Sequence, residues 1–299
     1  MFFVKWIEYG LVRLTVTCLR LLPVKWAYFS GAKIGWVAWR VLGSRRSTVK
    51  SNLSIVQCWL QTQGKADSGL VNEGSIDAAA KEVFCRSGAN ILSSFSFAAL
   101  PLERRLRQVE FVGLDILESA VSKGHGVVLL MAHMGPWEAV PAVILHLVHN
   151  LGTQLGAIYR PLNNKYMEDW YRCERESQGV KLFNRKEGLS QAFKFLKNGG
   201  ILALLADQRV KTGEDSELFG ESALTTALVG LLSKRVNAPV VSLTLGYDRS
   251  CKVKVGFRLV CFEKANSRAD YAKLTNQELE RMLSSDVTNG FWLHRRFIT

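Results

Sequence analysis

The chain has 299 residues, of which 48% are hydrophobic and 22% charged, and its formal net charge at pH 7 is +13. This length is enough to bury a full hydrophobic core, in one large domain or two. Six scattered cysteines without any C-x-x-C spacing argue against a zinc site or a disulfide framework, and they indicate a reducing compartment.

The positive charge is concentrated at the N-terminus, where residues 1–50 hold nine Lys or Arg and one Glu and so carry eight of the thirteen net charges. Wound as helices, residues 1–22 and 24–42 each place basic side chains on one side and Phe, Leu, Ile or Trp on another. This pattern is typical of amphipathic helices that lie on an anionic membrane surface.

Three alternatives for the N-terminal segment follow from the same residues. The two helices pack on the protein core, residues 1–22 cross the bilayer at a strong tilt, or the segment is a basic arm that binds nucleic acid. The apolar character of the segment disfavours nucleic acid as a partner. Charges interrupt the apolar run and no small-residue cleavage site follows, which argues against a cleavable signal.

The next part of the chain combines a polar stretch with helical patterns. Residues 44–75 begin basic and become polar, and Gln61–Ser75 is the best candidate for a loop. Apolar residues on one side predict a helix over 76–99, and residues 101–123 are expected to add Glu/Arg-rich helical material.

From Gly126 onward, short apolar runs alternate with helical patterns. Strands are expected near 126–132, 153–159, 180–183, 201–206 and 239–246, with helices near 136–149, 164–178, 187–198 and 223–236. Such alternation predicts an α/β fold with a mainly parallel central sheet and helices on both faces. Residues 251–262 alternate apolar and polar and are expected to add a strand at the sheet edge, and residues 269–289 a last helix.

A histidine follows the first of these buried strands. His133 comes directly after the apolar run 127–132, and Glu138 follows five positions later. On one straight helix the two side chains would diverge by about 140°, so they meet only if the chain turns at Gly135–Pro136. A histidine near neutral pH is a natural general base, and a carboxylate can fix its tautomer. The alternative is a glutamate that caps the helix beside a structural histidine.

Seven motifs in matching order and spacing resemble the late lipid A acyltransferases of Gram-negative bacteria, the lauroyl/myristoyl transferases. They are GHGVVLLMAHMGPWE (124–138), AIYRPLNN (157–164), NRKEG (184–188), ILALLADQ (201–208), LFG (218–220), TTALVGLLSKRVNAPVV (225–241) and FWLHRRF (291–297). The chain departs from the family at Pro136, where an Asn is usual, and at Phe219–Gly220, where a double-Phe-Gly is usual.

The resemblance implies an O-acyltransferase at the cytoplasmic face of the inner membrane, anchored through helices in residues 1–43, with a catalytic domain in residues 44–299. The donor would be a fatty acyl thioester of acyl carrier protein or coenzyme A, and the acceptor a hydroxyl of a lipid A precursor. His133 would act as general base, with Glu138 orienting it. No cofactor is implied, and no His/Cys/Asp/Glu cluster has the spacing of metal ligands.

Further site residues are expected where strands end, because ligands of open α/β sheets bind at the carboxyl ends of the strands. Arg160 is expected to bind a phosphate of the lipid or of the carrier's prosthetic group, and Arg185 and Lys186 offer two more cations. Asp207 is expected to hold Arg160 or Arg185, and Gln208 to bind the acceptor. His294 is expected to help dock the C-terminal tail rather than to act in catalysis.

Two other functions stay open from the sequence. The same chemistry could act on another lipid acceptor, such as a phospholipid, a mannoside or an amino-acid lipid. A catalytically silent adaptor that binds lipid or carrier protein is a different class, and Pro136 beside the histidine is the feature that favours it.

Overall fold

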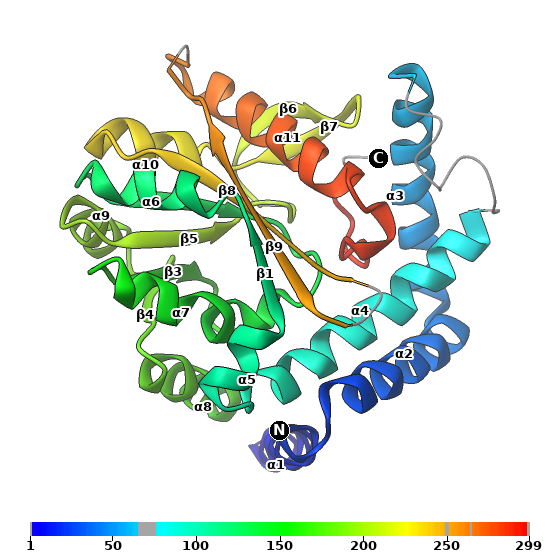
Figure 1. Cartoon of the computed structure of the whole chain (residues 1–299). Helices are drawn as coiled ribbons and strands as arrows, with labels where there is room; N and C mark the ends of the chain where they lie inside the picture. Colours follow the sequence, from blue (N-terminus) through cyan, green and yellow to red (C-terminus); the bar gives the residue numbers. More distant parts are fainter. Residues whose placement is uncertain (1, 65–75, 249–250, 264, 298–299) are drawn as a thin grey trace.

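A seven-stranded sheet forms the centre of the protein (Figure 1). The structure is a computed structural model that describes residues 2–64, 76–248, 251–263 and 265–297. The strands are β1 (Val109–Val112), β2 (Val127–Met131), β3 (Leu155–Tyr159), β4 (Lys181–Asn184), β5 (Ile201–Leu205), β6 (Glu214–Leu218), β7 (Glu221–Thr225), β8 (Val240–Tyr247) and β9 (Val253–Val260). The large sheet has the order β1-β9-β8-β2-β5-β3-β4, and β6 and β7 form a separate hairpin.

The predicted α/β class with a mainly parallel central sheet is confirmed. Every neighbouring pair in the large sheet is parallel except β8–β9. Residues 251–262 do contain a strand, β9, as expected, but its expected place at the sheet edge is wrong, because β1 pairs with it in parallel and forms the edge. β1 lies in a stretch that was expected to be helical, and its four residues are too few to show a period of their own.

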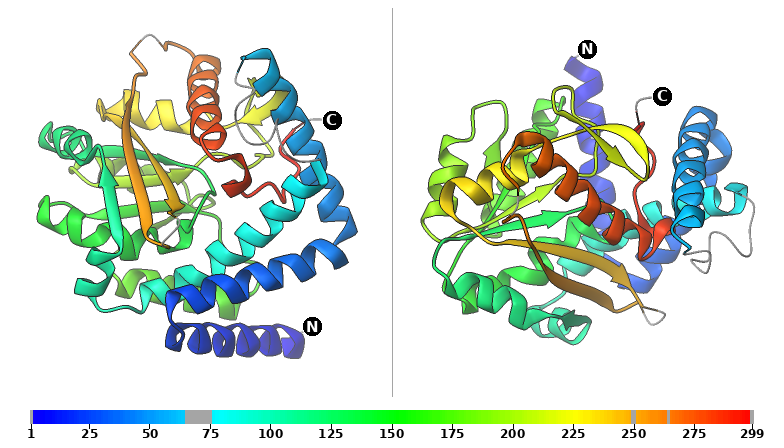
Figure 2. Two further views of the ribbon diagram at one scale, coloured as in Figure 1. Left: turned by 45° about the vertical axis from the view of Figure 1, so that its right-hand side comes forward. Right: turned by 90° about the horizontal axis from the view of Figure 1, so that it is seen from above.

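Helices cover both faces of the sheet (Figure 2). The α-helices among the described residues are α1 (Phe2–Leu21), α2 (Val24–Val41), α3 (Gly43–Thr62), α4 (Ile76–Ala98), α5 (Leu102–Arg107), α6 (Leu114–Ser122), α7 (Val140–Asn150), α8 (Lys165–Ser177), α9 (Ser190–Lys197), α10 (Leu228–Val236) and α11 (Arg268–Ser284). Two 3₁₀ turns, η1 (Trp137–Ala139) and η2 (Val287–Asn289), complete the described elements.

Two hydrophobic cores lie on the two sides of β2, as the alternation of strand side chains requires. Val128 and Leu130 point into one core with residues of α3, α9, α10 and α11. Val127 and Leu129 point into the other with residues of α6 and α7. All five residues of β2 are buried, which explains why the strand has the continuous apolar run of a central parallel strand.

The segment before α10 differs from its prediction. Residues 223–236 were expected to be one helix, but 221–225 form β7 and the helix begins only at Leu228. At the hairpin turn Phe219 and Gly220 have positive φ angles of 53° and 75°, and left-handed backbone at both central residues is what a tight two-residue hairpin requires. Phe219 tolerates this because its ring is buried against Trp59 and Trp292.

Helix α3 was also missed by the sequence. The predicted loop Gln61–Ser75 begins inside it, since α3 extends to Thr62, and residues 65–75 lie outside the described residues. The predicted helices at 1–22, 24–42 and 76–99 correspond to α1, α2 and α4. The cysteines are all free, and none is fully buried.

The N-terminal helices pack along the outside of α4 (Figure 2). α2 turns its small residues Ala27, Gly31 and Gly35 toward α4. α1 buries only Val16 and Leu19 among its described side chains, and its partners include α8, through an ion pair between Arg20 and Glu174. None of the helices in the described ranges combines the length and apolarity that a membrane crossing needs.

Candidate active site

The register of two central strands brings His133 and Asp207 together. Met131 of β2 pairs with Leu205 of β5 in parallel, and each chain then runs two residues beyond its strand. Because both strands point the same way, their carboxyl ends meet at one edge of the sheet. This juxtaposition depends on a long-range strand pairing that cannot be deduced from the spacing of residues along the chain.

Both ring nitrogens of His133 have a partner. Nδ1 lies 2.7 Å from Asp207 Oδ1, and the His133 backbone N–H donates to Asp207 Oδ2 at 3.0 Å. Nε2 lies 3.2 Å from the side-chain nitrogen of Gln208. An ionised Asp207 carboxylate can only accept hydrogen bonds, so Nδ1 of His133 must carry the proton. The lone pair on Nε2 is then the basic site.

The same pairing sets the charge of the site. Burial lowers the pKa of His133, but the nearby negative charge of Asp207 and their hydrogen bond outweigh burial and raise the pKa above its usual 6.5. Burial raises the pKa of Asp207, and the charge and hydrogen bonds of His133 outweigh it and bring the pKa below its ordinary value. Asp207 therefore stays ionised at neutral pH. The His133 side chain keeps 20% of its surface exposed, so solvent reaches the base.

The prediction that Glu138 orients His133 directly is wrong in its geometry. The Glu138 carboxylate instead forms an ion pair with Arg175 of α8, which also donates to the Glu138 carbonyl at 3.0 Å. The reason is local. Glu138 lies in η1, which precedes α7, and from there the side chain reaches toward α8. Its negative charge still contributes to raising the pKa of His133, after burial and Asp207.

The turn between His133 and Glu138 forms as its glycine predicts. Gly135 has a φ of +59°, and a Cβ placed there would lie 2.4 Å from the Leu245 carbonyl oxygen. Only glycine meets both conditions. The predicted helix 136–149 begins as η1, and α7 follows from Val140.

The prediction that Asp207 holds Arg160 or Arg185 is wrong. Both of its carboxylate oxygens bind His133 instead. Arg160 directly follows β3 and Arg185 directly follows β4, whose last residues Tyr159 and Asn184 are register partners. These two arginines and Lys186 are exposed at the carboxyl edge. In the described part of the chain none of the three forms an ion pair.

The C-terminal segment contributes residues that the sequence did not assign to the site. Phe291 donates its backbone N–H to the His133 carbonyl at 2.8 Å, and Met134 forms a β-bridge with Gly290. The Phe291 ring packs on both His133 and Trp137. The motif FWLHRRF (291–297) marks this segment in the sequence. The motif alone does not show that its first residue, Phe291, packs on His133.

His294 and Arg296 lie beside the same pair. With Asp207 and Gln208 they line a cavity of ≈ 10 Å³, which is about the space that one water molecule needs. Burial and the neighbouring His133 lower the pKa of His294. Burial lowers the pKa of Arg296 to about 10, against the pull of Asp207. The Arg296 guanidinium donates to Thr225 Oγ1 at 2.8 Å and to the Leu224 carbonyl at 2.9 Å, which fixes it behind the site.

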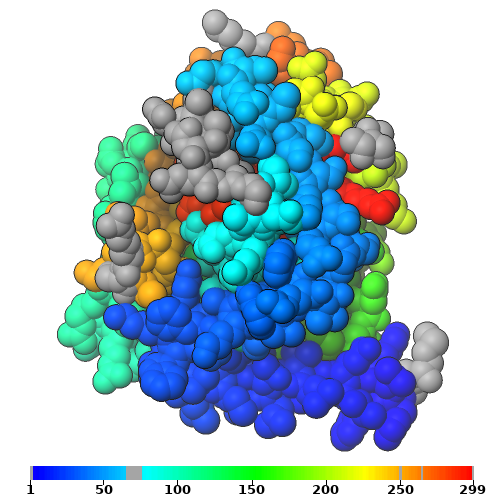
Figure 3. Space-filling model, turned by 90° about the vertical axis from the view of Figure 1, so that its right-hand side faces the viewer, coloured from blue at the N-terminus to red at the C-terminus, as the bar shows by residue number. Residues whose placement is uncertain are grey.

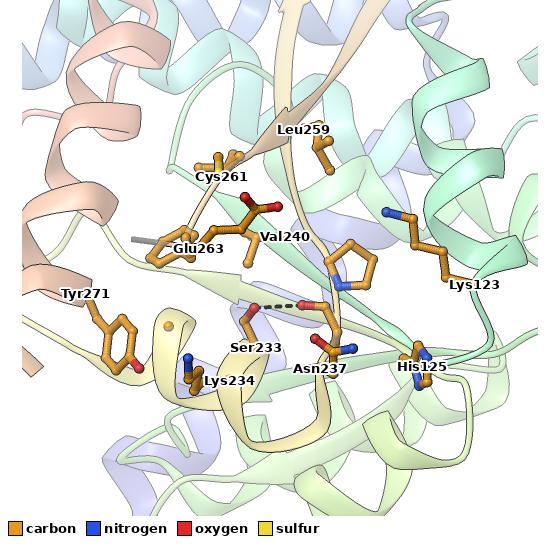
Figure 4. A pocket seen from close by; sticks show the side chains of 15 residues that line it. Lys123, His125, Ser233, Lys234, Asn237, Val240, Leu259, Cys261, Glu263 and Tyr271 are labelled. Carbon is orange, nitrogen blue, oxygen red and sulfur yellow. Dashed lines mark hydrogen bonds between the residues drawn. The ribbon is translucent and has the colours of Figure 1, made fainter. Parts of the chain in front are cut away.

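A larger groove of ≈ 580 Å³ lies at the opposite edge of the sheet (Figure 4). Lys123 and His125 line one side of it and Ser233 and Lys234 of α10 the other. His125 precedes the first residue of β2 whereas His133 follows the last, and the strand itself spans about 16 Å. This groove is therefore separate from His133. Within the described ranges no group of three or more His, Cys, Asp or Glu gathers as a metal site requires.

The fold and the site define an α/β protein with a histidine–carboxylate pair at the carboxyl edge of a mainly parallel sheet, an arrangement suited to acid–base chemistry. The chain belongs to the bacterial lipid A biosynthesis acyltransferase family, whose model matches residues 3–299. This match confirms the resemblance found from the motifs.

A curated relative is the lipid A biosynthesis acyltransferase of Haemophilus influenzae (strain ATCC 51907 / DSM 11121 / KW20 / Rd). It is 20% identical over 193 residues, which make up 62% of this chain and 58% of the relative. The match thus covers somewhat more than half the length of that protein.

Proposed function

We propose that the protein transfers a fatty acyl chain from acyl carrier protein, or from coenzyme A, to a hydroxyl of a lipid A precursor. The observation that supports this most directly is the His133–Asp207 pair at the carboxyl edge of the central strands, in a member of an acyltransferase family. The pair provides a general base with a fixed tautomer, which is what O-acyl transfer needs when the protein offers no covalent nucleophile.

In the proposed step, Nε2 of His133 takes the proton of the acceptor hydroxyl as its oxygen attacks the thioester carbonyl. The tetrahedral intermediate then expels the thiolate of the carrier, and the imidazolium returns the proton to that sulfur. Asp207 stabilises the imidazolium formed between these events. Glu138 acts as a positioning residue, through its charge and through its ion pair with Arg175.

The contact between Gln208 and His133 supports a position for the acceptor hydroxyl. Its side-chain nitrogen faces Nε2 of His133 at 3.2 Å, which is the contact that the hydroxyl must make for proton transfer. We infer that the amide moves aside when the acceptor binds and then donates to an oxygen of the substrate.

The exposed cations at the carboxyl edge are proposed to receive the donor. These cations follow the carboxyl ends of β3 and β4, at the same edge of the sheet as His133. They are Arg160, Arg185 and Lys186. Acyl carrier protein is acidic, and unpaired surface cations accelerate the encounter with an acidic partner.

The N-terminal helices are proposed to dock on the anionic inner membrane from the cytoplasmic side. Both helices expose large apolar side chains: Phe3, Leu11, Leu14 and Leu21 in α1, and Trp26, Phe29, Ile34 and Trp36 in α2. Lys5, Lys25, Lys33 and Arg40 flank these residues in the sequence. An apolar surface bordered by cations fits an interface with anionic lipid.

The test is a His133→Ala variant, assayed for acyl transfer from an acyl carrier protein thioester to a lipid A precursor. Removing the base is expected to lower kcat by about 10²- to 10⁴-fold. His125→Ala is the matched control, since this histidine lies at the other end of β2 and is exposed. Transfer by His133→Ala at the wild-type rate would rule out the mechanism. Mass spectra of lipids from cells with and without the protein identify the acceptor.

A further inference from the structure

A second polar cavity lies between α3 and the C-terminal segment. Its volume is ≈ 400 Å³, and its lining includes Arg209, Arg295 and four hydroxyl side chains of α3: Ser44, Ser47, Thr48 and Ser51. Figure 3 shows α3 and the C-terminal residues side by side on this face of the molecule. None of the described residues that line it is acidic.

The two arginines leave this cavity with uncompensated positive charge. Both side chains are exposed, and neither forms an ion pair with another residue in the ranges that the structure describes. Several other arginines of the described chain do have an acidic partner, such as Arg86 with Asp286 at 2.5 Å. Two guanidinium groups that share one cavity repel each other, and an anion between them removes that cost.

The opposite side of the cavity supplies neutral hydrogen-bond donors. Ser44, Ser47 and Ser51 are three and four positions apart and so share one face of α3. Ser47 donates to the Gly43 carbonyl at 3.2 Å, whereas the hydroxyls of Ser44 and Ser51 bond to no other residue of the described chain. Planar guanidinium groups opposite hydroxyl donors, without a carboxylate, match the oxygens of a phosphate group.

The position of the cavity indicates what carries the phosphate. Arg209 follows Gln208, whose amide faces His133, and Arg295 follows His294, which lines the small cavity at Asp207. On its other side α3 begins directly after Val41 and Leu42, apolar residues at the end of α2 that are 72% and 45% exposed. A phosphate bound here would lie between the catalytic base and the apolar surface of α2.

We propose that this cavity binds the phosphate monoester of the lipid acceptor and thereby sets the distance of its hydroxyl from His133. The proposal rests on the proposed acyl transfer for the identity of the reaction, but the site itself is defined by its own charges and donors. The phosphate anchors the headgroup, and the hydrocarbon chains extend along the exposed end of α2 toward the membrane.

The test measures binding of dihexanoyl phosphatidic acid, a soluble lipid with a phosphate monoester, to the full chain by isothermal titration calorimetry. Replacing both arginines in Arg209→Ala/Arg295→Ala is expected to weaken binding by about tenfold or more, since each loses a charge-assisted hydrogen bond. Dihexanoyl phosphatidylcholine, which has the same chains and no monoester, is expected to bind weakly to both proteins.

The matched control is Arg104→Ala/Arg107→Ala, which removes the same charge from exposed positions of α5. It is expected to bind phosphatidic acid as the wild type does. Equal weakening in the control would show a nonspecific charge effect and overturn the proposal, as would unchanged binding by Arg209→Ala/Arg295→Ala. The conservative Arg209→Lys/Arg295→Lys is expected to retain part of the affinity, which separates loss of the site from loss of the fold.

Two further arms separate the possible sources of the phosphate and the two proposals. If Arg209→Ala/Arg295→Ala loses the preference for coenzyme A over 3′-dephospho-coenzyme A but keeps its affinity for phosphatidic acid, the site serves the donor and the proposal is wrong. His133→Ala is expected to bind phosphatidic acid normally while losing transfer. A wild-type protein that binds phosphatidic acid through these arginines but transfers no acyl chain would remove the proposed function and leave the phosphate site.

Discussion

The partner of His133 is the feature on which the residue-scale chemistry depends. A carboxylate at Nδ1 both fixes the tautomer and raises the basicity of Nε2. The sequence offers Glu138 for this role because it is close along the chain, but the β2–β5 register supplies Asp207 instead. Glu138 is one contact further out, paired with Arg175.

Asp207→Asn is expected to shift the pH profile of the reaction. Only the free imidazole acts as a base, so kcat/KM rises with pH through the pKa of His133. In the wild type this midpoint lies above pH 6.5, since Asp207 raises that pKa. The substitution removes the charge, the pKa falls, and the midpoint moves to lower pH. The loss of tautomer control is expected to lower the plateau by about 10²- to 10⁴-fold, measured as kcat/KM between pH 5 and 9.

Glu138→Gln provides the comparison. Its carboxylate raises the pKa of His133 less than Asp207 does, so its midpoint is expected to shift in the same direction by a smaller amount, with a smaller loss of plateau activity. If Glu138→Gln lost as much activity as Asp207→Asn and shifted the midpoint as far, the assignment of Asp207 as the orienting group would be wrong.

At the scale of elements, the packing of α2 on α4 depends on glycines. A Cβ at Gly35 would lie 2.1 Å from the Phe84 carbonyl oxygen, and one at Gly31 would lie 2.4 Å from the Gly88 carbonyl oxygen. These neighbours are backbone atoms of α4, which cannot rotate away. The two helices therefore approach closely only because neither side chain is present.

Gly35→Ala is expected to lower the free energy of unfolding by about 1–3 kcal/mol, because α2 must move away from α4 to accept the methyl group. Gly10→Ala in α1 is the matched control. Nothing lies within 4 Å of a Cβ there, and alanine favours helix over glycine by up to about 1 kcal/mol. Urea titration of the three proteins in mild detergent measures both effects. A stability of Gly35→Ala equal to that of Gly10→Ala would contradict the close packing.

The elements that the sequence predicts well are those whose own pattern is decisive. β2 and β5 are continuous apolar runs, and α1, α2 and α4 carry long helical periodicity. The hairpin β6–β7 was missed because its first strand, EDSEL, is mostly polar and half-exposed. β1 was missed because only pairing with β9 makes its four residues a strand.

The candidate site was predicted only in part for the same reason. His133, Asp207 and Gln208 were each chosen as residues that follow a strand, but their mutual contacts depend on which strands are neighbours. The contribution of Phe291 depends on a bridge between residues more than 150 positions apart. Spacing along the chain carries no information on either.

At the scale of the whole molecule, most large apolar residues of the N-terminal helices face outward. The side of α1 that the sequence identifies as apolar, including Phe3, Leu14 and Leu21, is exposed in the folded chain. The protein core does not cover this apolar surface. Burying it in a bilayer would remove it from water, which is favourable. Figure 3 shows the N-terminal helices α1 and α2 along one edge of the molecule.

Trp26→Ser/Phe29→Ser is expected to weaken binding to phosphatidylglycerol vesicles by about tenfold or more, since each exposed aromatic contributes about 1.5–3 kcal/mol when it is buried. Added salt is expected to weaken wild-type binding, because it screens the basic residues beside the helices. Sedimentation with vesicles measures both effects. Leu102→Ser/Leu106→Ser removes exposed apolar residues of α5 and serves as control; an equal loss in this control would refute a specific α1–α2 interface.

Helix α3 holds the C-terminal segment beside the active site. Asn52 of α3 is buried, and its side-chain nitrogen donates to the Trp292 carbonyl at 2.9 Å and to the His294 carbonyl at 2.8 Å. This clamp holds the segment whose first residue, Phe291, packs on His133. Asn52 thus helps to position Phe291 against His133, although Asn52 itself does not contact His133.

Asn52→Asp is expected to release this segment. The substitution replaces the donor by an acceptor that faces two carbonyl oxygens in a buried place, which costs about 3–5 kcal/mol of unfolding free energy. Carboxypeptidase is expected to remove the C-terminal residues faster than in the wild type, and kcat to fall with them because Phe291 no longer covers His133. Ser54→Asp adds the same charge to an exposed position of α3. Equal digestion of the two variants would show that Asn52 does not hold the segment, whereas faster digestion of Asn52→Asp with an unchanged kcat would separate the clamp from the chemistry.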